Sequence, residues 1–447
     1  MNQLLTPGQR INTQFSVDNC KIEKFLGSGA QGEVYQVSWV DQPVALKWYF
    51  PQYVQHDTTL RERIQRIIKE FRTAPNDRFL WPLELAFQPS DTTTFGYLMP
   101  LREPRFKGMA DLMTRQIEPS FRALITAGIE LAESYRKLHA AGLCYRDISF
   151  GNVFFDPANG EVRICDNDNV DINHAAGAIG GTMRFMAPEI VRGEATPDTQ
   201  TDLFSLAVLL FYLLFNHHPL EGKRESAIRC FDLPAMTQLY GKAPRFIFDP
   251  NDDSNRPVPG EHDNALAFWA IYPAFLRNLF TRAFTAGSHD PQRRVREGEW
   301  RSVLIRLRDA LLYCPHCQAE NFYDVDQLRS TRQSPLCWAC QQMIQLPPRL
   351  RLQHAGETQI IMLNHDTQLY PYHLDSSQEF TVNASPAAAV TQHPTNPQIW
   401  GLQNLSSSKW VATTSEGNVR DVPPGRSITL ASGTRLQFGA SEGEIRM

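Results

Sequence analysis

The sequence predicts an α+β chain made of four consecutive parts: a small strand-rich lobe, a larger helical lobe, a short metal-binding segment and an all-β, sandwich-like region. Short β-rich runs such as KIEKFL, GEVYQVSWV and PVALKWYF occupy residues 20–105. Helical periodicity dominates residues 110–312, and residues 203–215 are apolar all round, which is typical of a buried helix. After residue 348, turn signals such as EGN, PPG and ASGT separate short apolar runs.

The composition restricts the class of protein. The 447 residues are 42% hydrophobic and 21% charged, as in a chain that buries a core. The formal net charge of −4 argues against a protein that coats nucleic acid. The N-terminus lacks the pattern of a secretory signal, and the apolar run at 203–215 is shorter than the roughly 20 residues of a membrane span. We therefore expect a soluble, cytoplasmic protein that binds neither nucleic acid nor membranes.

A glycine-rich motif lies between two expected strands. Gly27, Gly29 and Gly32 are followed by Val34, which completes the pattern GxGxxGxV. Glycines allow a backbone to approach a phosphate closely, but an ordinary hairpin turn would also explain them. The flanking strands disfavour a dinucleotide-binding turn, which should open a helix. Lys47 follows in the strand VALK, where it either contacts phosphates or is an edge-strand lysine with its amine in water.

Several further motifs follow in a fixed order. They are YRDISFGN at 145–152, DND at 166–168, GT at 181–182, APE at 187–189, TDLFSL at 201–206 and DPQRR at 290–294. Each is weak alone, but their order and gaps resemble the eukaryotic-like (Hanks-type) protein kinases across residues 15–312. The resemblance implies a bilobal kinase fold, with an N-lobe at 15–100 and a C-lobe at 101–312.

The resemblance also implies the catalytic residues of a serine/threonine kinase that uses ATP and Mg²⁺. Lys47 would contact the α- and β-phosphates, and Asp147 would accept or orient the proton of the substrate hydroxyl. Asn152 and Asp166 would hold Mg²⁺. The nucleotide site would be formed by Gly27, Gly29, Gly32, Val34, Ala45, Lys47, Glu70, Met99 and Leu101.

Two further pairs would be structural. The resemblance implies that Glu189 pairs with Arg294 and that Asp202 braces the catalytic loop. A glutamate of the expected helix at 60–71 should pair with Lys47. Glu70 is preferred over Glu62 because it flanks the apolar stripe of that helix.

Three positions depart from the family pattern. Tyr145 replaces a histidine, Asp168 replaces the glycine of Asp-Phe-Gly, and Ser149 stands where a lysine is usual. Asp168 would stiffen its loop or add a carboxylate near the metal. The alternatives to an active kinase are a nucleotide-binding pseudokinase scaffold and an interaction protein that acts through its C-terminal parts.

The segment before Thr182 bears on regulation. Residues 169–181 contain no serine, threonine or tyrosine. Kinases are commonly switched on when a phosphorylated loop residue pairs with arginines, here including Arg146. We therefore expect a kinase that is constitutively competent or controlled by a partner protein, and not by loop phosphorylation.

Two CxxC pairs predict a zinc ribbon at 313–348. Cys314 and Cys317 are separated from Cys337 and Cys340 by nineteen residues, a spacing typical of a four-thiolate zinc site. Four thiolates close the coordination shell, so the site should be structural.

Residues 349–447 resemble a forkhead-associated-like β-domain. The resemblance lies in Asn404-Leu-Ser followed by Trp410, in the Pro-Gly turn before Ser427, and in GTRLQFG at 433–439. The Gly-Arg and Ser-x-x-His features of phosphothreonine readers are not matched cleanly, with VTQH ending at His393 only a partial match. We favour plain protein docking over phosphopeptide recognition, and His393 and Asn404 fit turn stabilisation as well as ligand binding.

The order kinase, zinc ribbon and forkhead-like domain resembles kinases of bacterial phosphatase–kinase–von Willebrand A triads linked to tellurium resistance. YRDISFGNVFF and CDNDNVD suggest it most. The resemblance implies a protein substrate, a von Willebrand A-type partner or activator, and an opposing phosphatase.

Overall fold

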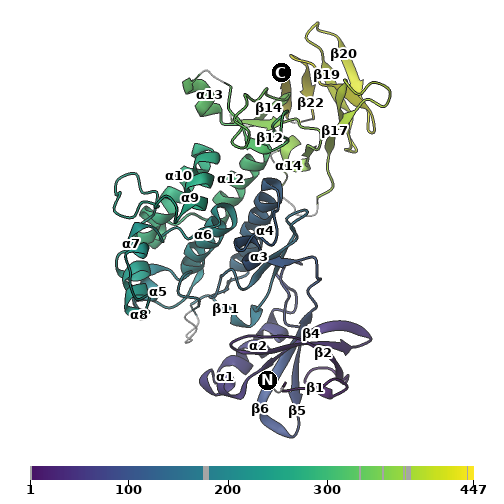
Figure 1. The fold of residues 1–447 in the computed structure, drawn as a ribbon. Coiled ribbons are helices and arrows are strands. Elements are labelled where there is room, and N and C mark those ends of the chain that lie inside the picture. The colour runs from purple at the N-terminus through teal and green to yellow at the C-terminus, as the bar shows by residue number, and fades with distance from the viewer. Residues whose placement is uncertain are drawn as a thin grey trace. The chain divides into compact units, whose positions relative to one another are not determined.

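Figure 1 shows the fold in a computed structural model that describes residues 3–174, 181–331, 334–354, 357–375, 378, 384–439 and 441–447. The chain divides into two compact units. The first is Met1–Trp269 with Asn278–Arg301, and the second is Ala270–Arg277 with Ser302–Met447. Among the described residues, no helix combines the length and the apolar character that crossing a membrane requires.

The N-terminal lobe is a closed barrel with the strand order β1-β2-β3-β4-β6-β5. β1 (Arg10–Thr13) closes it because this short strand pairs with β2 and with β5. The other elements of the lobe are β2 (Cys20–Ser28), β3 (Gly32–Trp39), β4 (Gln42–Tyr49), α1 (Pro51–His56), α2 (Leu60–Glu70), β5 (Glu84–Gln88) and β6 (Asp91–Pro100).

Strand β4 is buried on both faces. Leu46 and Trp48 belong to one apolar cluster of the lobe, whereas Ala45 and Tyr49 belong to a second cluster that includes residues of α2. Successive strand residues point to opposite faces, so Lys47 shares the face of Ala45 and Tyr49. The alternation therefore directs the Lys47 amine toward the second cluster.

The helical lobe is organised around α6 (Thr199–Phe215), which is buried along nearly its whole length, as the apolar run at 203–215 predicted. Asp198 caps its N-terminus by accepting a hydrogen bond from the Thr201 amide. The other helical segments are α3 (Met109–Met113), α4 (Phe121–Ala140), η1 (Asn167–Asn169), α5 (Pro188–Val191), α7 (Lys223–Ser226), α8 (Leu233–Met236), η2 (Thr237–Lys242), α9 (Asp263–Ile271), α10 (Ala274–Phe284), α11 (Ala286–His289), η3 (Pro291–Arg293) and α12 (Glu297–Asp309).

Short antiparallel strands hold the loops that carry the candidate site. One set is β7 (Lys107–Gly108), β9 (Val153–Phe155) and β10 (Val162–Ile164), and the other is β8 (Leu143–Cys144) and β11 (Asp171–Ile172). Residues 145–152 connect β8 to β9, and residues 165–170 connect β10 to β11. The pairing therefore brings the ends of these two loops close together.

In the second unit, a hairpin of β12 (Leu311–Tyr313) and β13 (Glu320–Phe322) precedes α13 (Val325–Thr331). Residues 349–447 then form two antiparallel sheets around one apolar core. The first sheet has the order β15 (Glu357–Met362), β14 (Arg349–His354), β23 (Glu442–Arg446), β22 (Arg435–Gln437), β19 (Trp410–Thr413) and β20 (Val419–Val422). The second has the order β16 (Gln368–Leu369), β17 (Ala388–Gln392), β18 (Trp400–Asn404) and β21 (Ser427–Thr429), and α14 (Pro371–Leu374) follows β16.

Candidate active site and metal centre

The glycine-rich turn joins β2 to β3, and its glycines have different reasons to be there. A Cβ on Gly32 would lie 2.1 Å from the carbonyl oxygen of Trp48, so the close approach of β3 to β4 requires glycine. A Cβ on Gly27 or Gly29 would meet no atom within 4 Å, and neither residue has a positive φ. Packing does not require glycine at these two positions, and the absence of side chains there fits a turn that leaves space for a ligand.

Lys47 is buried within a cluster of carboxylates. Its Nζ lies 3.2 Å from Oδ1 of Asp166 and 3.0 Å from Oδ2 of Asp168, and it donates to Oε1 of Gln31 at 2.6 Å. Burial acts to lower the pKa of Lys47, but the charges of Asp166 and Asp168 raise it above its usual value. Lys47 is therefore a buried cation, and not an edge-strand lysine with its amine in water.

Neither glutamate considered for the pair with Lys47 contacts it. Glu62 and Glu70 are both exposed on α2. The polar residue that α2 buries is Arg63, whose Nε donates to the backbone oxygen of Asp168 at 2.9 Å. The expected pairing with Glu70 is thus not formed, because the buried face of the helix carries an arginine and Asp168 supplies the carboxylate.

Four apolar residues of the expected nucleotide site pack in or against one cluster of the barrel. Ala45 pairs with Met99 across β4 and β6, and both are buried in the cluster that faces α2. Val34 and Leu101 are partly buried and pack against the same cluster. These four side chains form an apolar surface close to Lys47, whose register partner on β3 is Val34.

The catalytic-loop motif folds around Asp147. Its Oδ1 accepts hydrogen bonds from the amide and hydroxyl of Thr182, both at 2.9 Å. Nδ2 of Asn152 donates to the backbone oxygen of Asp147 at 2.8 Å and to its Oδ2 at 3.2 Å, which leaves Oδ1 of Asn152 for another partner. Burial raises the pKa of Asp147, against the effect of these hydrogen bonds.

Asp166 lies beside this loop. The amide of Cys165 donates to the backbone oxygen of Asn152 at 2.8 Å, and this contact places the next residue, Asp166, beside the catalytic loop. Asp166 has a left-handed backbone, with φ 51° and ψ 44°, and its side chain is 36% exposed. Its carboxylate therefore remains accessible while it contacts Lys47.

The backbone of the catalytic loop is braced by Asp202, as predicted. Asp202 accepts hydrogen bonds from the amides of Tyr145 at 2.5 Å and Arg146 at 3.0 Å. His139 contacts Asp202 through Nε2 at 3.1 Å and Glu297 through Nδ1. The other predicted structural pair is also confirmed, since Arg294 lies 2.7 Å from Glu189.

Tyr145, which replaces the usual histidine, has a specific contact. Its ring packs edge-on against Tyr135, and its hydroxyl donates to the backbone oxygen of Cys165, next to Asp166. The replacement thus links the catalytic loop to the strand that leads into Asp166.

Asp171 links α2 of the N-terminal lobe to the catalytic loop. It lies on β11, 3.1 Å from Nη1 of Arg66 on α2 and 3.4 Å from Nη2 of Arg146. Asp171 and Arg146 are both buried. The segment that contains this contact continues into residues 175–180, which lie outside the described residues, so the structure describes only part of the segment 169–181.

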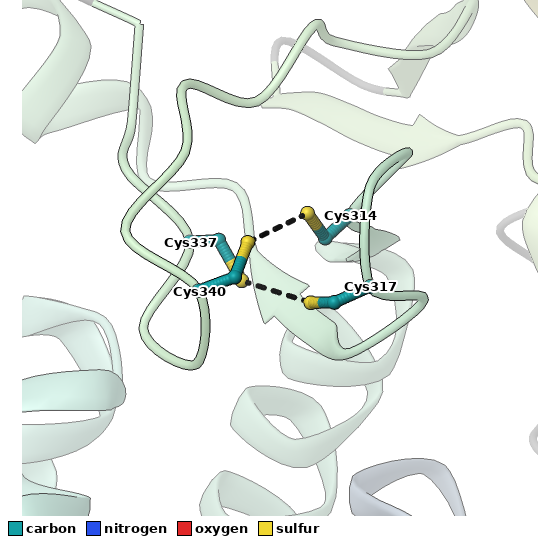
Figure 2. A group of neighbouring side chains, drawn as sticks. All are labelled: Cys314, Cys317, Cys337 and Cys340. Atoms are coloured by element: carbon teal, nitrogen blue, oxygen red, sulfur yellow. Dashed lines mark hydrogen bonds between the residues drawn. The ribbon is translucent and has the colours of Figure 1, made fainter.

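The four CxxC cysteines form one cluster, and Figure 2 shows their sulfur atoms facing one another. Sγ of Cys314 lies 3.6 Å from that of Cys340, Sγ of Cys317 lies 3.6 Å from that of Cys337, and all four atoms lie within 4.8 Å of one another. A tetrahedral zinc site with Zn–S bonds of about 2.3 Å has sulfur separations of about 3.8 Å. A disulfide needs about 2.05 Å, so the spacing fits a shared metal and not a bond between cysteines.

The two cysteine turns have matching backbones. Gln318 follows the first pair and Gln341 the second, with φ of 63° and 59°. Each glutamine amide donates back to the first cysteine of its turn, Cys314 or Cys337, at 2.9 Å. Burial acts to raise the pKa of Cys337, but hydrogen bonds from backbone amides and from Asn321 lower it to about 6.

In the β-region, Asn404 stabilises turns. It is fully buried, and its Nδ2 donates to the backbone oxygens of Ser408 at 2.8 Å and Val422 at 2.9 Å. His393 is exposed, and its Nδ1 lies 3.3 Å from the amide of Thr395. Of the two alternatives for Asn404, these contacts favour turn stabilisation.

Three polar residues of the site were missed or left open by the sequence. Asp168 was noticed but not assigned to Lys47, and the roles of Arg63 and Asp171 were not foreseen. The available signal was charge: an arginine among the apolar positions of α2, and a second acid two residues after Asp166. Charge alone does not reveal which groups meet across the fold.

Comparison with known proteins gives a consistent result. The family model for the protein kinase domain matches residues 20–256, more than half of the chain. A probable serine/threonine-protein kinase, gdt4 of Dictyostelium discoideum, is 27% identical over 259 residues, which cover 55% of this chain and 15% of that protein.

Two further relatives are ribosomal protein S6 kinases. The alpha-4 kinase of Mus musculus is 29% identical over 226 residues, 47% of this chain and 28% of that protein. The alpha-2 kinase of Homo sapiens is 29% identical over 212 residues, 45% of this chain and 27% of that protein. The match thus spans less than a third of the length of each of these relatives.

Proposed function

Because this chain belongs to the protein kinase family, we propose that it transfers a phosphoryl group from Mg-ATP to a serine or threonine hydroxyl of a protein. The convergence of Lys47, Asp147, Asn152 and Asp166 is the observation that carries the proposal. Lys47 contacts Asp166 at 3.2 Å, and Asn152 contacts both Asp147 and the backbone before Asp166.

The donor set suits Mg²⁺, which prefers oxygen ligands from one or two carboxylates together with phosphates and water. The accessible carboxylate of Asp166 and Oδ1 of Asn152 would hold the ion, which neutralises charge on the phosphates when bound. The Gly27–Gly29 turn leaves space for phosphates, and Lys47 orients them. Asp147, held by Thr182 and Asn152, orients the substrate hydroxyl and accepts its proton.

The test is transfer of label from γ-labelled ATP to the chain itself and to generic protein substrates, in the presence of Mg²⁺. Asp147→Asn and Asp166→Asn should each reduce transfer by at least a hundredfold, whereas Asp253→Asn, a change of the same chemistry at an exposed position, should not. Absence of transfer, together with thermal stabilisation by Mg-ATP that Asp166→Asn removes, would favour the pseudokinase scaffold.

We propose that loop phosphorylation does not control the enzyme, since residues 169–181 contain no serine, threonine or tyrosine. The support is Asp171, a fixed carboxylate that pairs with Arg66 and Arg146, where a loop phosphate would otherwise supply negative charge. Protein treated with a phosphatase and then freed of it should retain its full initial rate. A rate that is lost on this treatment and recovered after incubation with ATP, with phosphate found at Thr182, would contradict the proposal.

Control by a partner is the remaining part of this proposal. The family resemblance supports a von Willebrand A-type activator and an opposing phosphatase. The test is addition of the purified candidate partner to the chain, with the initial rate of transfer as the readout. An increase that saturates with partner concentration would support an activator, and an unchanged rate would count against it.

We propose that the cluster of Cys314, Cys317, Cys337 and Cys340 binds one structural zinc ion. Native mass spectrometry should give one zinc per chain, and Cys317→Ser should lower this occupancy. Cys230→Ser, an exposed cysteine outside the cluster, should leave it unchanged. A metal-free chain after expression and refolding with zinc would overturn the assignment.

For residues 349–447 we propose protein docking by a forkhead-associated-like domain. Asn404 is used internally, which favours docking over phosphothreonine recognition. Fluorescence anisotropy with a degenerate phosphothreonine peptide library tests the choice. Binding to the phosphothreonine library that is absent with the unphosphorylated library would favour phosphothreonine recognition.

A further inference from the structure

The carboxylate of Asp168 is enclosed by donors. Lys47 approaches both oxygens, at 3.0 and 3.2 Å. The hydroxyl of Tyr49 donates to Oδ2 at 2.5 Å, and that of Tyr97 donates to Oδ1 at 3.2 Å. Asp168 is 0% exposed, so both of its oxygens are committed to groups of the protein.

The neighbouring acid is in a different situation. Asp166 contacts Lys47 through one oxygen only, and its side chain is 36% exposed. An accessible carboxylate can take a metal ligand position, whereas a buried one with four donor contacts cannot do so without losing them. The two acids therefore have different roles. The carboxylate of Asp166 is accessible to a metal ion, whereas that of Asp168 binds Lys47 and the two tyrosines.

The environment of Asp168 is fixed from two directions. Asn167, before it, is fully buried and donates through Nδ2 to the backbone oxygens of Leu80 at 2.8 Å and Ile164 at 3.0 Å. Arg63 of α2 donates to the backbone oxygen of Asp168 and forms an ion pair with Asp57 at 2.8 Å. Helix α2 thus fixes the position of Asp168 through Arg63, but it contributes no carboxylate to Lys47.

We propose that Asp168 is the positioning residue for Lys47, in the role expected of a glutamate of α2. The inference rests on the proposed kinase function. It implies that Lys47 takes its counter-charge from the same short turn that carries Asp166, and that α2 acts on the lysine only through the contact of Arg63 with Asp168.

The activity test compares Asp168→Asn with Glu62→Gln and Glu70→Gln in the full chain. We expect Asp168→Asn to lower kcat at least tenfold and to change the KM for ATP less than threefold, because the charge of Lys47 remains while its position is lost. The two helix variants, which represent the rival assignments, should stay within twofold of the unaltered chain. A loss of kcat in Glu70→Gln as large as that in Asp168→Asn would overturn the proposal.

A second test needs no turnover. Thermal unfolding of the nucleotide-free protein is measured for Asp168→Asn, Lys47→Met and the double variant. If Asp168 holds Lys47, the midpoint of the double variant should fall no further than that of Lys47→Met alone. Strictly additive shifts would overturn the inference. If the unaltered chain shows no phosphotransfer, that result counts against the proposed function, but the comparison of the single and double variants still decides whether Asp168 pairs with Lys47.

Discussion

The nucleotide site and the cysteine cluster differ in how much apolar core surrounds them. Lys47 lies on a strand packed between two apolar clusters of the N-terminal lobe. The cluster around the cysteines consists of five buried residues, Leu312, Cys314, Cys337, Ile344 and Met362, and two of these are metal-ligand candidates. The first site is shaped by packing that needs no ligand, whereas the second has little apolar core, so we expect it to keep its shape only with the proposed ion.

The largest effect should follow removal of zinc. Binding of structural zinc is worth on the order of 10–16 kcal/mol at pH 7, so a chelator should unfold residues 313–348. Amide hydrogen exchange should show loss of protection in that segment and unchanged protection of β3 and β4.

The matched control is Cys230→Ser, which should exchange like the unaltered chain. If residues 313–348 stay protected after complete metal removal, the difference between the two sites does not hold.

A single added methyl group should disrupt the packed site. In Gly32→Ala, the Cβ would lie 2.1 Å from the backbone oxygen of Trp48, and neither backbone can move without disturbing the barrel. We expect a loss of about 3 kcal/mol in the free energy of unfolding, measured by chemical denaturation. Gly29→Ala, where the Cβ meets open space, should cost less than about 1 kcal/mol, and equal losses would show that packing does not shape this turn.

The buried charges of the first unit should make its stability depend on pH. Burial acts to lower the pKa of His139, but Asp202 and Glu297 raise it to about 9. Because the folded pKa exceeds the unfolded value of about 6.5, this stabilisation is complete below pH 6.5 and is lost as the pH rises through 9.

The expected contribution is about 3.5 kcal/mol, since the pKa rises by about 2.5 units and each unit corresponds to about 1.4 kcal/mol. It is measured as the difference in unfolding free energy between the unaltered chain and His139→Gln from pH 6 to pH 10. A difference that stays constant over this range would contradict the assignment of the charge network.

The smallest effect should be that of Asn404→Ala. This change leaves the backbone oxygens of Ser408 and Val422 without their donor and should cost about 1–2 kcal/mol. Asn396→Ala, at an exposed turn, should cost a few tenths of that amount. If Asn404→Ala costs several times more than Asn396→Ala in chemical denaturation, buried contacts shape the β-region, as they shape the first unit. Equal losses would show that they do not.

The family resemblance was enough to expect Lys47, Asp147, Asn152 and Asp166 close together, and short loops at paired strand ends do bring Asp147, Asn152 and Asp166 beside one another. The partner of Lys47 was not predictable in the same way. α2 offers exposed glutamates and one buried arginine, and a sequence pattern does not show which of them faces a lysine 15 to 23 residues away in the chain. Strand β1 was also not predictable, since four residues with three polar side chains give little periodicity.

In the β-region, the first and last strands are neighbours. Arg349 of β14 pairs with Arg446 of β23, so the chain leaves the domain beside the point where it enters. A domain with adjacent ends can be inserted into a surface loop of another protein without forcing that loop apart. Circular permutation across the junction of β14 and β23 should therefore keep both sheets, as long as the cysteine turns that pack on Met362 are retained.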